Sequence, residues 1–86
     1  MAAIDDIILQ KDTYLVVQTA SILNPGKTGV SLSYGIIVKK SDLSDMYEVD
    51  EYIAYLPNQG MPLIYDNINY KLLELKHIIY SEGFEK

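Results

Sequence analysis

The tripeptide Gly26-Lys27-Thr28 is the first pattern with a recognisable chemistry, because Gly-Lys-Thr ends many phosphate-binding loops. Such a loop also needs a glycine where Ser21 stands, and it connects a strand to a helix. Gly29 and a serine-rich stretch follow, and this composition does not start a helix. The sequence therefore predicts a Pro-Gly turn in a flexible loop rather than a nucleotide site.

Adjacent carboxylates are a second potential source of chemistry, and they occur at Asp5-Asp6 and Asp50-Glu51. Neighbouring residues in a strand point to opposite faces, so neither pair is expected to converge on one substrate. The single histidine, His77, has no nucleophile arranged with an acid around it, and the chain contains no cysteine. We therefore expect solvated carboxylates, a surface histidine, no metal site, no cofactor and no enzymatic activity.

The residues after Gly29 predict binding rather than catalysis. Val30 and Leu32 alternate with Ser31 and Ser33, so an extended segment would present two aliphatic side chains on one side. Such a segment could lie in a partner's groove with both aliphatic side chains in pockets. One copy would bind weakly, and several copies on a ring would bind well through effective concentration. The alternative is that Val30 and Leu32 simply begin the next strand.

Length and charge narrow the class of protein. The chain has 86 residues, which predicts one domain over 1–86, and its 49% apolar content favours oligomerisation as extra support for a small core. The net charge is −5 and all cations are lysines, which argues against nucleic acid and anionic membranes as partners. The first residues are acidic and no segment is long enough to span a membrane, so a cytoplasmic location is expected.

The elements that would position the binding segment are short strands. β-Branched and aromatic runs between Gly, Pro, Asn and Asp predict strands at 13–19, 34–39, 47–56, 63–65 and 68–75. The strand at 47–56 is expected to be interrupted or bulged near Asp50 and Glu51. The segment 21–33 is predicted to be a long loop, and Asp66-Asn67 a hairpin turn. In the last of these strands, Tyr70 and Leu72 are expected to point inward. Together these elements predict an all-β fold, a small barrel or sandwich.

The end of the chain allows more than one interpretation. Residues 75–83 could form one helical turn or a final short strand, and a helix over 71–80 is a further alternative.

The order of these features resembles the co-chaperonins of the GroES type, the 10-kDa chaperonin family. The resemblance covers most of the chain, through LQKDTYLVV (9–17), TGVSLS (28–33), YGIIVKKS (34–41), YEVDEYIAYLPNQG (47–60) and INYKLLELKHIIY (68–80). The chain departs from the family pattern at Asp50, where a glycine is usual, and at Ser31, within a tripeptide that is usually hydrophobic. A short connection between Lys39 and Glu48 corresponds to a reduced roof hairpin, as in some phage-encoded members.

The resemblance implies a GroES-like β-barrel that forms a seven-subunit ring and caps a large ATP-driven chaperonin of the GroEL type, enclosing a folding client. Gly29, Val30, Ser31 and Leu32 would form the mobile-loop contact with the chaperonin, and ATP would be bound by that partner. The N- and C-terminal strands of neighbouring subunits would pair to build the ring. The alternative is a small acidic β-barrel interaction module, such as a phage adaptor, an assembly protein or a host-factor inhibitor.

Overall fold

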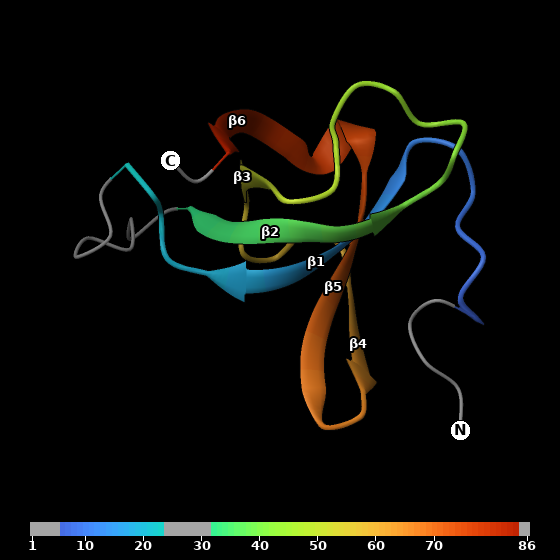
Figure 1. Ribbon diagram of the computed structural model, residues 1–86. Helices are drawn as coiled ribbons and strands as arrows, with labels where there is room; N and C mark the ends of the chain where they lie inside the picture. Colours follow the sequence, from blue (N-terminus) through green and yellow to red (C-terminus); the bar gives the residue numbers. More distant parts are fainter. Residues whose placement is uncertain (1–5, 24–31, 85–86) are drawn as a thin grey trace.

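The protein folds as one antiparallel sheet, according to a computed structural model that describes residues 6–23 and 32–84 (Figure 1). Its strands are β1 (Thr13–Thr19), β2 (Ser33–Lys40), β3 (Glu51–Tyr55), β4 (Met61–Tyr65), β5 (Ile68–Glu74) and β6 (Ile78–Phe84). The sequence-based prediction of an all-β fold is confirmed.

The strand order β4-β5-β1-β2-β3-β6 leaves the sheet open. Figure 1 shows the sheet curling, with the β4–β5 hairpin standing away from the β1–β2 pair. The shape is barrel-like, but β4 and β6 do not pair with each other, so each is an edge strand in the described part of the chain. An unpaired edge exposes backbone donors and acceptors that another strand could use.

The main hydrophobic cluster is built from residues on five of the six strands. Every strand except β4 contributes to the buried cluster, which consists of Tyr14, Val16, Ile37, Ile53, Tyr55, Leu73 and Ile78. Tyr14 pairs with Leu73 across β1 and β5, which turns the Leu73 side chain toward the core. Side chains alternate along a strand, so Tyr70 and Leu72 lie on the face opposite Leu73. This face is covered as well: Tyr70 is buried, as predicted, and Leu72 is half-buried and pairs with the buried Leu15.

The third strand begins later than the sequence pattern indicated. Asp50 has a positive φ of 75°, which extended strand backbone does not adopt. The Glu51 N–H donates to the carbonyl oxygen of Glu48 at 3.2 Å, which closes a turn just before β3, and the Asp50 N–H ties this turn to Ile37 at 2.8 Å.

The hairpin between β4 and β5 has the predicted turn. Asp66 and Asn67 have φ values of 52° and 65°, and these two residue types tolerate left-handed backbone angles better than most. The turn sets Tyr65 opposite Ile68 and thereby the register of the hairpin.

The last part of the chain combines two of the predicted alternatives. A single 3₁₀ turn, η2 (Leu75–His77), leads directly into β6, and the alternative helix over 71–80 does not form. Two bulges interrupt the pairing of β6 with β3, so that Ile79 and Glu82 have no residue opposite them. Bulges bend a strand and redirect its side chains.

Candidate partner-binding site

The predicted partner-binding residues lie at the boundary of the described structure. Gly29, Val30 and Ser31 are outside the described residues, so the structure does not place them. Leu32 is half-buried and immediately precedes β2. Residues 24–31 of the predicted loop also lie outside the described residues, and Ser33, which the prediction placed in that loop, is the first residue of β2. The role of these residues in binding stays a prediction.

The N-terminal base of this segment is held by a contact that sequence reasoning missed. The Ser21 hydroxyl donates to Glu82 Oε2 at 2.5 Å, and the Ile22 N–H donates to Glu82 Oε1 at 3.0 Å. Ser21 is only 1% exposed. The segment thus leaves the sheet beside the end of β6, next to Leu23, which is 63% exposed.

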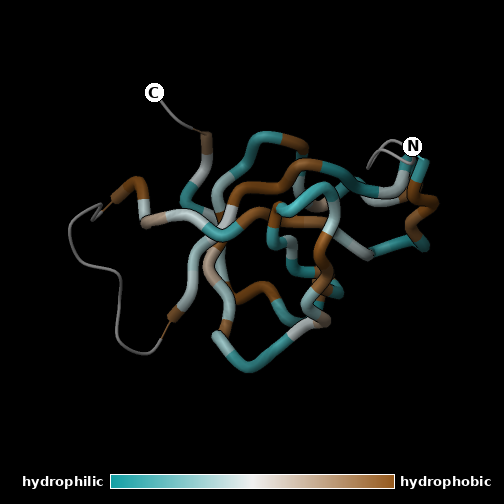
Figure 2. Tube along the Cα trace, turned by 90° about the horizontal axis from the view of Figure 1, so that it is seen from below, coloured by the Kyte–Doolittle hydropathy of each residue, from teal (hydrophilic) through white to brown (hydrophobic). Residues whose placement is uncertain are grey.

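A short N-terminal arm, residues 7–10, forms a second exposed apolar feature. It belongs to no strand, and Ile8 is 94% exposed. Figure 2 shows hydrophobic colour along this part of the chain, which lies on the side opposite the C-terminal end of β6 in both Figure 1 and Figure 2. Covering such an exposed apolar side chain with a partner lowers the free energy of the system, so Ile8 favours association.

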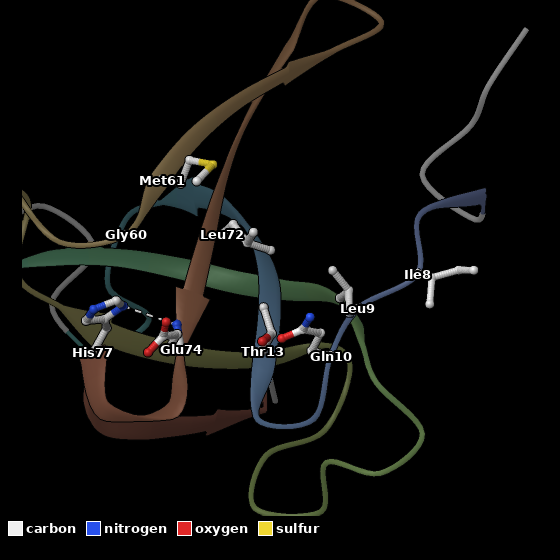
Figure 3. A pocket seen from close by; sticks show the side chains of 9 residues that line it. All are labelled: Ile8, Leu9, Gln10, Thr13, Gly60, Met61, Leu72, Glu74 and His77. Atoms are coloured by element: carbon white, nitrogen blue, oxygen red, sulfur yellow. Dashed lines mark hydrogen bonds between the residues drawn. The ribbon is translucent and has the colours of Figure 1, made fainter.

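The arm borders a cavity of about 540 Å³ (Figure 3). The cavity is lined by Ile8, Leu9, Gln10, Thr13, Gly60, Met61, Leu72, Glu74 and His77. His77 and Glu74 bond to each other here, since the Glu74 N–H donates to His77 Nδ1 at 3.1 Å. The predicted surface histidine is thus half-buried, and its side chain caps the start of η2.

The free edge of β6 is a third apolar feature. Ile79 is 50% exposed, Tyr80 38% and Phe84 50%. A hydrogen bond with Tyr34 raises the pKa of Tyr80 above its usual value, with a smaller contribution from burial. β6 contains neither proline nor lysine, the residues that commonly protect an edge from pairing.

The connection between β2 and β3 is acidic, and an ion pair and several hydrogen bonds fix part of its conformation. Lys40 Nζ contacts Glu48 Oε2 at 2.6 Å and the carbonyl oxygen of Ser44 at 2.6 Å. The hydrogen bond to Glu48 raises the pKa of Lys40. Glu51 accepts hydrogen bonds from the Glu48 N–H at 2.9 Å and from the Ser81 hydroxyl. Asp50 is exposed as expected, but Glu51 is not simply solvated.

The described residues contain no group of three or more histidine or acidic side chains that could hold a metal ion. Within the same part of the chain, no helix has the length and apolar character needed to cross a membrane.

Comparison with known proteins adds no relative: no family model matches the chain, and no curated protein is significantly similar to it. The resemblance to co-chaperonins therefore depends on the order of sequence features alone.

Proposed function

We propose that this protein is a co-chaperonin that assembles into a seven-subunit ring and caps a large ATP-dependent chaperonin in the cytoplasm, closing a chamber around a folding client. In this proposal Gly29, Val30, Ser31 and Leu32 dock on the chaperonin, which binds and hydrolyses the ATP. The protein itself performs no chemistry and needs no cofactor.

The observation that carries the proposal is the placement of two unpartnered apolar features on opposite sides of the molecule. The arm at residues 7–10 exposes Ile8, and the β6 edge exposes Ile79 and Phe84. A contact between such features on two copies is head-to-tail, and head-to-tail contacts generate a ring when the rotation closes. Pairing would also cover the open β6 edge, which otherwise invites aggregation.

The position of the binding segment supports the same proposal. The segment between β1 and β2 starts and ends at neighbouring central strands, so both of its ends are held by the sheet. The symmetry of a ring would then present the segment of every copy in the same orientation. Burying one aliphatic side chain contributes roughly 1.5–3 kcal/mol, and the ordering cost offsets much of this. Repetition around a ring would convert weak single contacts into stable capping.

Native mass spectrometry at micromolar concentration tests the assembly. We expect a dominant seven-subunit species. A protein that stays monomeric over the whole accessible concentration range would contradict the ring.

Amide exchange tests the capping. Exchange at Leu32 should slow when a GroEL-type chaperonin is added, and Leu32→Ser should abolish binding while the ring persists. Leu43→Ser is the matched control, because Leu43 is 69% exposed and lies in the β2–β3 connection. If Leu32→Ser and Leu43→Ser lose binding equally, Leu32 is not a specific contact with the chaperonin, and the proposed docking residues are wrong.

One observation favours the alternative, a small acidic interaction module. The β2–β3 connection and the start of β3 carry Asp42, Asp45, Glu48, Asp50 and Glu51, and no basic residue lies among them. Such a surface would attract a basic partner, and its binding would weaken steeply with salt. Replacing Asp42 and Asp45 with asparagine should then reduce binding, whereas Leu32→Ser should not.

A further inference from the structure

We propose that Glu82 is a positioning residue, which anchors the first residues of the 21–33 segment to the edge strand β6 and so fixes where this segment leaves the sheet. The consequence for partner binding depends on the proposed function, but the anchoring itself can be tested without any partner.

The direction of the Glu82 side chain follows from a bulge in β6. Ser81 lies opposite Ile53 and Gly83 opposite Tyr52, which leaves Glu82 as the extra residue. Gly83 adopts a φ of 85°, a backbone conformation that glycine reaches without strain. The Gly83 N–H donates to the Ser81 hydroxyl at 2.9 Å, which supports the local conformation. Bulges commonly redirect a side chain, and here the redirected carboxylate reaches the chain after β1.

The carboxylate holds three consecutive residues through a short chain of hydrogen bonds. It accepts from the Ser21 hydroxyl and from the Ile22 N–H, and the Ser21 oxygen in turn accepts from the Leu23 N–H at 3.1 Å. Hydrogen bonds to a carboxylate are about twice as strong as bonds between neutral groups. Residues 21–23 are therefore restrained although they lie outside any strand.

This restraint has two consequences for a partner-binding segment. Residues that are already fixed need not be ordered again when a partner binds, and ordering a residue costs conformational entropy. Glu82 also lies in the strand whose outer edge is open, so pairing of β6 with another chain and the position of the segment are physically linked. Assembly of copies through β6 should stabilise the anchored arrangement.

Amide exchange of the isolated full chain tests the anchor. In Glu82→Ala, exchange at Ile22 should be faster by on the order of ten- to a hundredfold, the factor that corresponds to a hydrogen bond with a charged acceptor. Glu82→Gln retains one neutral acceptor oxygen and should restore part of the protection. Asp42→Ala is the control for charge, because it removes one exposed carboxylate from the β2–β3 connection and should leave Ile22 unchanged.

Unchanged exchange at Ile22 in Glu82→Ala, with the core amides still protected, would overturn the proposal. If Glu82→Ala also speeds exchange of the core amides, the effect on the anchor is tested with Ser21→Ala instead. This variant removes only the hydroxyl that bonds to Glu82 and to the Leu23 N–H. Faster exchange at Ile22, whose own acceptor is Glu82, with a protected core supports the anchor, and unchanged exchange at Ile22 overturns it.

A second measurement separates this inference from the proposed function. If the wild-type ring binds a chaperonin, Glu82→Ala should weaken binding about tenfold per docking segment, the cost of ordering one further residue, and Glu82→Gln should restore part of it. If the wild-type protein binds no chaperonin, the proposed function fails, while the exchange result still decides the anchor.

Discussion

Replacing Tyr14 with phenylalanine should stabilise the protein, which is unusual for a core substitution. Tyr14 is 0% exposed, and its hydroxyl has no hydrogen-bond partner in the described structure. A buried polar group without a partner costs about 1–3 kcal/mol. The ring contacts, including an edge-to-face contact with Tyr47 at a centroid distance of 5.8 Å, remain in the variant. The void left by one oxygen atom costs a few tenths of a kcal/mol, at about 24 cal/mol per Å³.

The net expectation is a gain of about 1–2 kcal/mol in the free energy of unfolding. Urea denaturation at one protein concentration measures it as a higher midpoint with an unchanged slope. Tyr34→Phe is the matched control, because the Tyr34 hydroxyl is bonded to Tyr80 and its loss should cost about 0.5–1.5 kcal/mol. A Tyr14→Phe variant as destabilised as this control would refute the reasoning and would indicate an ordered water on the Tyr14 hydroxyl.

Three further changes test the backbone and the core. Gly60→Ala should lower the free energy of unfolding by about 2–4 kcal/mol in urea denaturation, because an added Cβ at its φ of 84° would lie 2.5 Å from the Leu73 side chain. Gly83→Ala should lower it by only about 1–2 kcal/mol, because Gly83 has a similar φ of 85° but no atom within 4 Å of the added Cβ. Equal losses in the two variants would contradict the packing argument. Asn67 has a φ of 65°, which valine adopts only with strain and glycine adopts freely, so Asn67→Val should lower the free energy of unfolding by about 1–2 kcal/mol and Asn67→Gly should not. Equal melting temperatures of Asn67→Val and the wild type would show that residues 66 and 67 form a different type of turn. Burial raises the pKa of Tyr55 above 10.0, so stability should fall as pH rises through the folded-state pKa, and less steeply in Tyr55→Phe; identical pH profiles would exclude Tyr55 as the cause.

Local chemistry was enough to predict most of the strands. The β-branched run at Thr13–Thr19 forms β1 with the predicted bounds, and the turn at Asp66 and Asn67 follows from the tolerance of these residues for positive φ. In both places the residues themselves determine the backbone, so no knowledge of distant contacts was needed.

Features that depend on pairing between distant strands could not be predicted. Both faces of β5 carry apolar residues, so alternation alone cannot say which face is the core, and only the pairing of Leu73 with Tyr14 decides it. The contact between Ser21 and Glu82 joins residues 61 positions apart and depends on a bulge in the C-terminal strand. A glutamate near the end of a chain carries no sequence signal for such a role.

The two open edges differ in a way that bears on how copies would associate. Both edges expose large apolar side chains, but β4 contains Pro62, which lacks an N–H and weakens any added strand, whereas every residue of β6 keeps its backbone donor. Pairing of β6 with β6 of a second copy is self-complementary and would stop at a dimer. Pairing of β6 with the arm of residues 7–10 always leaves one unused arm at one end of the growing assembly and one unused edge at the other, so it continues until a ring closes. The stoichiometry therefore reports which surface covers β6: a dimer indicates edge-to-edge pairing, and a larger closed ring indicates the arm.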